Sequence, residues 1–464
     1  MSAGVPLLLG SQGEADGAKI ATPELRGEGV GLRLQALAAA AKEKQPETHD
    51  AQHPSRGPPC PAVAYQYAGP DAQSSPNATN HTFSGILDAG SDSRITQCHR
   101  LFMDLNDAQS DPATGHTPVF CTIIPPHILD NLAQSDDPER HEPARRTLEH
   151  DHVRRTERRE LAARGGLTPG EPDAAADKPR RTVYDARHHE DLPGHKVHGE
   201  KDGPSKDASV NRAHAGLGAT FELYLKVYGR KSIDGAGLPL NATVHYGRKY
   251  DNAFWDGERM VFGDGDNDLF KDFTIPVDVI GHELTHGVTQ YTANLTYEGQ
   301  PGALNESVSD VFGVLIKQYA LGQTADQADW LIGADLLGPN VTGTALRSMK
   351  APGTAYDDDV LGKDPQPATM KGYVRTTDDN GGVHINSGIP NHAFYLAATA
   401  LGGKAWERAG QVWYDVLTGG KLSKDAQFAD FAALTVKAAQ ARFGTGDEHE
   451  AMVKAWTQVG VTPK

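Results

Sequence analysis

Cysteine is scarce in this sequence. The 464 residues include only Cys60, Cys98 and Cys121, so no disulfide can form within the residues that follow Cys121. We expect packing and bound ions to stabilise that part of the chain. So few cysteines leave the redox compartment undecided.

Long apolar runs are absent as well. No stretch of 18 apolar residues occurs, so we expect no membrane span. The first ten residues lack a basic segment and contain only three consecutive leucines, which makes a poor secretory signal. Cytoplasmic storage and export without a removable signal therefore both stay open.

Positive charge is also in deficit. Lys and Arg number 45 against 61 Asp and Glu, which gives a formal net charge of -16. A duplex-binding domain would carry a basic patch, so we expect no nucleic-acid partner. A hydrophobic content of 38%, with 50 Gly and 29 Pro, indicates a loop-rich soluble protein with disordered parts.

Residues 1–118 are expected to form a disordered extension. Segments such as residues 52–59, which read QHPSRGPP, cannot bury enough apolar surface to offset chain entropy. A short helix over residues 32–44 is the one element that we expect there. As an alternative, this extension is not translated in the cell, because Met103 lies shortly before the next segment.

An H-E-x-x-H run occupies residues 282–286. On a helix, His282 and His286 lie one turn apart on the same face, as two ligands of a tetrahedral zinc ion require. Glu283 lies one step round the helix and can act on a metal-bound water. Glu306 is the candidate third ligand, and Asp310, one turn later, is a candidate partner for a ligand imidazole.

Two other interpretations of the H-E-x-x-H motif are less favoured. The motif alone also fits an exposed amphipathic helix with two solvated histidines, but the second acid-bearing helix favours zinc. A metzincin would need Gly at position 289 and His at position 292, where this chain has Thr289 and Thr292.

Longer runs in a fixed order carry a family resemblance. They are residues 252–255 (NAFW), 260–266 (MVFGDGD), 278–289 (DVIGHELTHGVT), 302–307 (GALNES), 346–349 (LRSM) and 380–388 (NGGVHINSG). With these runs, the chain from about residue 185 to 464 resembles the thermolysin-like neutral metallopeptidases. The resemblance is closest to the short-propeptide, protealysin-like branch.

The resemblance implies a catalytic set. His282, His286 and Glu306 match the ligands of one catalytic zinc ion, and Glu283 matches the general base. Further matches are Tyr297 and His384 for stabilising the oxyanion, Asp379 for orienting His384, and Asp310 and Asn305 for holding the zinc-binding imidazoles.

The resemblance also implies a substrate site. Asn252, Ala253 and Trp255 match the segment that hydrogen-bonds the substrate backbone, and Arg347 matches the arginine beside the first primed pocket. The apolar residues that would line this pocket are Phe270, Phe273, Val279, Ile332, Leu336 and Leu346. Such a pocket favours cleavage on the N-terminal side of bulky hydrophobic residues, although any one of the six also fits a plain core position.

Calcium is where the sequence departs from thermolysin. Asp278, Asp329 and Asp335 match acids of its double calcium site, but other acids of that site are replaced by Lys317, Leu331 and Ala334. We expect the double site to be lost and Lys317 to neutralise Asp278 instead. Residues 264–268 resemble the start of an EF-hand loop, but Leu269 stands where Gly is required, which predicts a turn.

Residues 119–164 look like the short inhibitory propeptide of that branch. The apolar run at residues 121–129, with Pro125 and Pro126 at its centre, suits docking in a peptide-binding groove. Cys121 could place a thiolate on the zinc, but a packed thiol is the favoured reading. Residues 165–184 form a linker where we expect maturation cleavage, and the His-rich residues 188–198 are expected to form a solvated loop.

The expected fold class is α+β. It is a two-lobed thermolysin-like catalytic unit, with a β-rich N-terminal lobe (185–292), a helical C-terminal lobe (293–464) and zinc in the cleft between them. Periodicity predicts strands at residues 244–255 and 259–262. It predicts helices at residues 213–228, 276–291, 302–319, 394–401, 409–417, 428–441 and 448–459.

The predicted function is that of a zinc-dependent neutral endopeptidase, made as a zymogen and inhibited by its own propeptide. We expect a monomer that acts on peptide or protein substrates, and the family resemblance favours secretion. A zinc-fold binding module without turnover is disfavoured, because Glu283, Tyr297 and His384 are all present. An aminopeptidase is disfavoured, because no G-x-M-E-N signature occurs.

Overall fold

The computed structural model describes residues 122–163, 170 and 176–463. The expectations for residues 1–118, for Cys121 and for part of the linker at residues 165–184 fall outside these residues. Within the described part of the chain, no helix is both long and apolar enough to cross a membrane.

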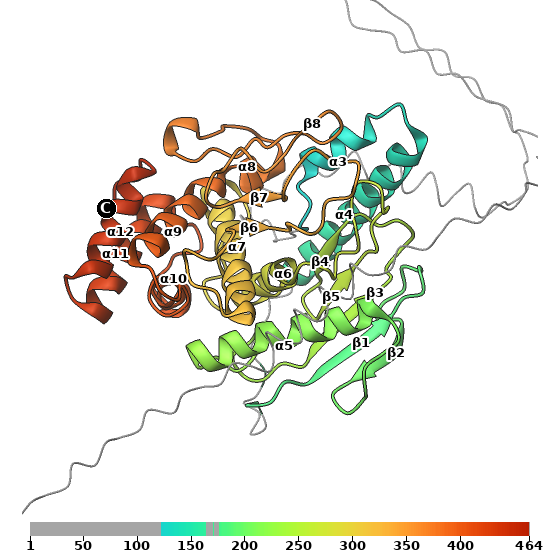
Figure 1. Cartoon of the computed structure of the whole chain (residues 1–464), viewed down its shortest axis with the longest axis horizontal. Helices are drawn as coiled ribbons and strands as arrows, with labels where there is room; N and C mark the ends of the chain where they lie inside the picture. Colours follow the sequence, from blue (N-terminus) through green and yellow to red (C-terminus); the bar gives the residue numbers. More distant parts are fainter. Residues whose placement is uncertain (1–121, 164–169, 171–175, 464) are drawn as a thin grey trace, which may run out of the picture. The chain divides into compact units, whose positions relative to one another are not determined.

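A five-stranded sheet in the order β2-β1-β3-β5-β4 forms the first part of the catalytic region. The central strands β1, β3 and β5 are parallel, whereas the edge strands β2 and β4 are antiparallel to their neighbours. Helix α5 packs along the sheet (Figure 1). The bounds are β1 Arg181–Asp185, β2 His195–Gly199, α5 Ala208–Tyr228, β3 Leu240–Val244, β4 Ala253–Trp255 and β5 Arg259–Phe262.

The single strand expected over residues 244–255 is wrong. The chain leaves β3 at Val244 and enters β4 only at Ala253. Between them, His245, Gly247 and Lys249 have φ values of 54°, 66° and 50°. Such left-handed residues cannot continue a strand, so this segment becomes a loop.

Two long helices cross where the H-E-x-x-H run lies. They are α6 (Val277–Gln290) and α7 (Gly299–Leu321), drawn in yellow at the centre of Figure 1. A Cβ at Gly313 of α7 would lie 2.5 Å from the carbonyl oxygen of Asp278 and 3.2 Å from the backbone nitrogen of His282. Glycine at this crossing lets α7 approach the backbone of α6, and this brings Glu306 and Asp310 to the two histidines.

Helices dominate the chain from Asp379 onwards, in orange to red in Figure 1. They are α8 Asp379–Asn386, α9 Gly388–Leu401, α10 Ala409–Thr418, α11 Phe428–Phe443 and α12 Asp447–Gln458. Short elements precede them: β6 Leu331–Ile332, β7 Arg347–Ser348, β8 Asp357–Asp358, β9 Gly362–Lys363 and the 3₁₀ turn η1 Met370–Gly372. The α+β arrangement with a β-rich first part and a helical second part is confirmed.

The propeptide-like region folds as two helices. Helix α3 (Pro126–Ala133) starts at the second proline of the Pro-Pro pair, a position where the missing N–H costs nothing. Helix α4 (Pro138–Ala163) follows it and is rich in charged residues. Residues Ile123, Ile124, Ile128 and Leu129 are buried and join the same apolar cluster as the catalytic region.

A histidine bridge ties the sheet to α5. His245 Nε2 lies 2.8 Å from Asp207, which caps the start of α5, and its Nδ1 lies 2.8 Å from Asp264. The hydrogen bond with Asp264 raises the pKa of His245, burial opposes this, and Asp207 adds to the rise, so the pKa reaches about 9.

This bridge predicts a loss of stability at high pH. The folded pKa of His245 exceeds its usual value of 6.5, so its stabilising effect is complete below pH 6.5 and disappears as the pH rises through about 9. We expect His245→Gln to lower the free energy of unfolding by on the order of 2 kcal/mol at pH 6 and by much less at pH 10. Urea unfolding of both chains, in a Glu283→Gln background that prevents self-digestion, measures this; an equal loss at both pH values would contradict it.

Candidate active site

Three side-chain atoms converge where α6 crosses α7. The Nε2 atoms of His282 and His286 lie 3.0 Å apart, and the oxygens of Glu306 lie 3.5 Å from the first and 3.6 Å from the second. All three side chains are buried. Within the described part of the chain, this is the one group of three or more His, Cys, Asp or Glu whose ligand atoms come close enough to hold a metal ion.

The other ring nitrogen of each histidine is already bound. His282 Nδ1 lies 2.8 Å from Asp310 Oδ1, and His286 Nδ1 lies 2.9 Å from Asn305 Oδ1. Burial alone would raise the pKa of Asp310, but Arg347 and His282 beside it hold that pKa well below its usual range. An ionised carboxylate and an amide oxygen can only accept, so both histidines carry their proton on Nδ1.

This arrangement fits a zinc ion. With the proton on Nδ1, each neutral imidazole presents a lone pair at Nε2, and the two lone pairs face each other across 3.0 Å. Burial would raise the pKa of Glu306, yet His384 beside it lowers that pKa, so Glu306 adds a negative charge. Two imidazole nitrogens and a carboxylate are the donor set of a catalytic zinc site with one open position.

Glu283 lies beside this group on α6. It is fully buried, and its Oε2 accepts a hydrogen bond from the backbone nitrogen of Trp255 at 3.2 Å. Since Trp255 ends β4, this bond fixes the carboxylate of Glu283 relative to the strand expected to bind substrate.

Tyr297 and His384 lie on the other side of Glu306. The Tyr297 hydroxyl donates to Glu306 Oε1 and lies 3.4 Å from His384 Nε2, which is itself 3.5 Å from Glu306 Oε2. Asp379 holds His384 twice, accepting from its backbone nitrogen at 2.8 Å and lying 2.6 Å from its Nδ1. Burial would lower the pKa of His384, but Asp379 and Glu306 raise it.

A run of left-handed residues makes this pairing feasible. Asp379, Asn380, Gly381 and Gly382 have φ values of 52°, 50°, 82° and 76° at the start of α8. This tight reversal returns Asp379 to the ring and backbone of His384, five residues later. Two of the four positions are glycine, which adopts this conformation without steric cost.

Asp310 is shared by several elements. Its carboxylate accepts from Arg347 Nε and Nη2, both at 2.9 Å, and from Asn391 Nδ2 at 2.8 Å, in addition to its contact with His282. Asn391, on α9, was not singled out from the sequence. It lies just after the run at residues 380–388, and that position alone does not indicate a functional role.

The expected substrate-binding segment is occupied by the chain itself. Ile123 donates its backbone N–H to the carbonyl oxygen of Ala253 at 3.3 Å and accepts from Arg347 Nη1 at 3.2 Å. Ile124 donates its N–H to Asn252 Oδ1 at 3.1 Å. These bonds place residues 123–124 on the segment that was expected to bind substrate backbone.

The expected pocket residues all lie inside the protein. Phe270, Phe273, Val279, Ile332, Leu336 and Leu346 are at most 1% exposed and belong to one apolar cluster. That cluster also contains Ile123, which is fully buried.

Sequence reasoning missed a carboxylate from the propeptide helix. Asp151 of α4 accepts from the Tyr250 hydroxyl at 2.8 Å and from Asn252 Nδ2 at 3.1 Å, and lies 3.4 Å from the Thr122 hydroxyl. In a single sequence, an acid in a highly charged helix gives no sign of this burial. His127 was missed too: its Nε2 lies 2.9 Å from the Tyr356 hydroxyl, and burial lowers its pKa to about 4.

Lys317 lies where the sequence suggested a replaced calcium site. Its ammonium is 3.1 Å from Asp278 and 2.8 Å from Asp329. Burial would lower the pKa of Lys317, but the two carboxylates raise it, so the lysine stays charged.

Comparison with known proteins assigns the family. A model described as "Thermolysin metallopeptidase, catalytic domain" matches residues 173–290, and one described as "Thermolysin metallopeptidase, alpha-helical domain" matches residues 293–461. The chain belongs to the thermolysin metallopeptidase family. It is therefore a metalloendopeptidase of a family that depends on zinc.

Three relatives place the chain within the thermolysin family. An extracellular metalloprotease of Pectobacterium carotovorum subsp. carotovorum is 48% identical over 348 residues, which cover 74% of this chain and 96% of that protein. A thermolysin of Alicyclobacillus acidocaldarius is 39% identical over 290 residues, covering 60% of this chain and 50% of that protein. The solved precursor of protealysin from Serratia proteamaculans is 50% identical, with a TM-score of 0.67, and the match covers 74% of this chain and all of that one.

The likeness to a precursor bears on how this thermolysin-family enzyme is made. That match spans the propeptide of protealysin as well as its catalytic part, since it covers the whole solved precursor. It supports synthesis as a zymogen with a short propeptide, as the sequence predicted.

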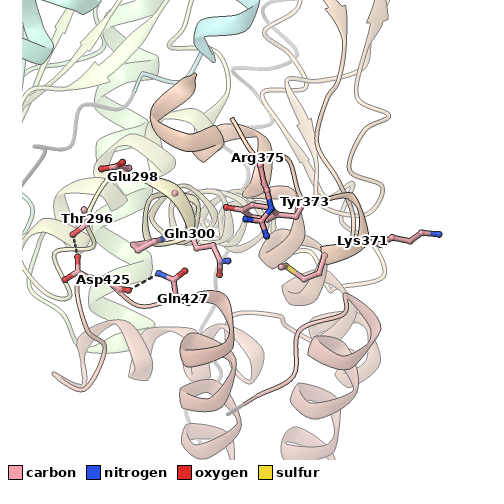
Figure 2. Close-up of a pocket in the computed structure, with 11 residues that line it drawn as sticks. Thr296, Glu298, Gln300, Lys371, Tyr373, Arg375, Asp425 and Gln427 are labelled. Carbon is pink, nitrogen blue, oxygen red and sulfur yellow. Dashed lines mark hydrogen bonds between the residues drawn. The ribbon is translucent and has the colours of Figure 1, made fainter. Parts of the chain in front are cut away.

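A separate cavity lies next to Tyr297 and is not part of this site. It has a volume of about 700 Å³ and lies between the start of α7, the turn η1 and the loop before α11 (Figure 2). Acids and bases are mixed on its walls, which carry Glu298, Asp425, Lys371 and Arg375. In Figure 2, Asp425 is bonded to Thr296 and Gln427 rather than directed at a common centre.

The shared role of Asp310 predicts the effect of removing its charge. Asp310→Asn weakens the orientation of His282 and leaves the guanidinium of Arg347 buried without its anion. We expect zinc affinity to fall about ten- to a hundredfold and the free energy of unfolding to fall by about 3–5 kcal/mol. Competition with a chromophoric chelator and urea unfolding measure the two effects. Asn305→Ala is the matched variant, since it removes the partner of His286 and leaves the Arg347 pair intact; an Asp310→Asn chain that binds zinc normally would contradict the account.

Proposed function

We propose that His282, His286 and Glu306 bind one zinc ion in a neutral endopeptidase held inactive by residues 122–163. The observation that carries this proposal is the convergence of three acceptor atoms in a buried site, two of them on imidazoles whose Nδ1 protons are already donated. Such a site is electrostatically unfavourable without a cation.

Glu283 is proposed as the general base. When bound, zinc lowers the pKa of a water molecule towards about 7 and polarises the scissile carbonyl. Glu283 does not belong to the ligand group, and the Trp255 backbone fixes its orientation. It accepts a proton from the attacking water and passes this proton to the leaving amine.

Tyr297 and His384 are proposed to stabilise the oxyanion. Both side chains lie against Glu306. Asp379 contacts Nδ1 of His384 and so orients the ring with its Nε2 towards Glu306. Donors positioned in this way contribute about 3 kcal/mol each to stabilising the transition state.

We infer a preference for bulky hydrophobic residues after the cleaved bond. The support is the bond from Arg347 to the carbonyl of Ile123, a residue whose apolar side chain is fully buried. Asn252, Ala253 and Arg347 would bind the backbone of such a substrate as they now bind residues 123–124.

We also propose that the enzyme acts outside the cell. The support is the relative from Pectobacterium, whose name describes it as extracellular.

Replacing the proposed base tests the function directly. Glu283→Gln keeps the bond to the Trp255 backbone and the three zinc ligands, so we expect normal zinc content. Chelator-sensitive cleavage of a quenched peptide with Gly-Leu at its centre should fall at least about a thousandfold. Glu258→Gln is the control, because Glu258 has a mostly exposed side chain and lies outside the site. Near-normal turnover by the Glu283→Gln chain would overturn the assignment.

We propose that Lys317 replaces the double calcium site. Asp278 is buried, so Lys317→Ala leaves an unpaired carboxylate and should cost about 3–5 kcal/mol of unfolding free energy. Asp329→Asn is the matched control, because Asp329 is 44% exposed and its loss should cost less than about 1 kcal/mol. Adding EGTA should leave the melting temperature of the unmodified chain unchanged; a large drop would show that calcium still binds there.

A further inference from the structure

Residues 123–124 are held by the segment at the start of β4. The N–H of Ile123 donates to the carbonyl oxygen of Ala253, and the N–H of Ile124 donates to the side-chain Oδ1 of Asn252. Two residues after Ala253, the backbone nitrogen of Trp255 holds Glu283.

The contacts of Ile123 identify the peptide bond that the proposed enzyme would cleave. Both backbone polar groups of Ile123 are bound, its N–H by Ala253 and its carbonyl by Arg347, the arginine expected beside the first primed pocket, and its side chain is fully buried. In the proposed endopeptidase, the residue in this pocket follows the cleaved bond. We propose that the Thr122–Ile123 peptide bond is a processing site that the enzyme cleaves within its own molecule. This inference rests on the proposed function.

Asp151 helps to position this peptide bond. Its carboxylate accepts from Asn252 Nδ2 and lies 3.4 Å from the Thr122 hydroxyl. It thereby orients Asn252, whose Oδ1 accepts from the N–H of Ile124. Asp151 is a positioning residue, because it acts through Thr122 and Asn252 and not on the reacting atoms.

The reaction is a hydrolysis that needs only water. The C–N bond between Thr122 and Ile123 breaks, and a C–O bond forms at the carbonyl carbon of Thr122. Glu283 transfers one proton of the water to the nitrogen of Ile123, which leaves as an amine, and Thr122 becomes the new carboxyl terminus. Because both partners belong to one chain, the effective concentration of the bond is far above that of any free peptide.

Cleavage here separates residues 1–122 without opening the site. Downstream of Ile123, the propeptide stays bound through His127 to Tyr356, Asn131 to the Leu361 carbonyl at 3.0 Å, and Arg140 to Asp268 at 3.3 Å. The product that begins at Ile123 thus continues to occupy Asn252 and Arg347. The structure therefore assigns two steps to maturation, with release of inhibition waiting for the later cut at residues 165–184.

The test follows intact mass in the purified, zinc-loaded full chain. We expect two products, residues 1–122 and a fragment that begins at Ile123, whose masses sum to that of the parent chain plus one water. Their rate of appearance should not change on tenfold dilution. Hydrolysis of an added quenched peptide should stay suppressed until mass is lost at residues 165–184.

Variants distinguish this proposal from the function on which it rests. Ile123→Leu should cleave at this bond like the unmodified chain, whereas Ile123→Asp should slow it at least about a hundredfold, because the pocket cannot pair a carboxylate. Glu283→Gln should not cleave it at all. A chain that hydrolyses the quenched peptide after losing its propeptide, yet keeps the Thr122–Ile123 bond intact throughout, would overturn the proposal and leave the endopeptidase function standing. Failure to hydrolyse the quenched peptide by a chain freed of residues 122–163 would overturn the function itself.

Discussion

The active site depends on one buried carboxylate, that of Asp310. It accepts from His282 on α6, Arg347 on β7 and Asn391 on α9, while Asp310 itself lies on α7. A charge buried this deeply is tolerable only when its partners are complete, so the four elements must pack together for the site to exist. The same guanidinium that neutralises Asp310 reaches the carbonyl of Ile123 through its remaining nitrogen. One ion pair therefore links the metal centre to the segment that blocks it.

We propose that inhibition in this zymogen uses the contacts of substrate binding. Residues 123–124 are held by Ala253, Asn252 and Arg347, and the proposed propeptide adds anchors that a free peptide lacks, such as Asp151 between Tyr250 and Asn252. Each anchor is worth little alone, but on this proposal they together keep the segment bound after its own cleavage. Affinity and slow release, rather than an altered catalytic group, would then keep the precursor inactive.

Much of this could be predicted from the sequence, because spacing within one helix is a local property. The H-E-x-x-H run on α6, and Glu306 with Asp310 on α7, follow from periodicity. The family and the α+β fold, predicted from the order of the matching runs, are confirmed. The break between β3 and β4 was missed because left-handed conformations at His245 and Lys249 leave no mark in the residue types. Asp151 and Asn391 were missed because their partners lie 101 and 81 residues away. The roles of the site residues and the calcium replacement at Lys317 stay predictions.

The most direct test of the central claim is zinc K-edge X-ray absorption of the Glu283→Gln zymogen. If His282, His286 and Glu306 hold the ion, one zinc per chain should show nitrogen and oxygen neighbours at about 2.0–2.2 Å, with scattering from two imidazoles. The spectrum should be unchanged by Cys121→Ser. A sulfur neighbour at about 2.3 Å that disappears in that variant would show a thiolate on the metal, and failure to bind zinc at all would contradict the account of the site.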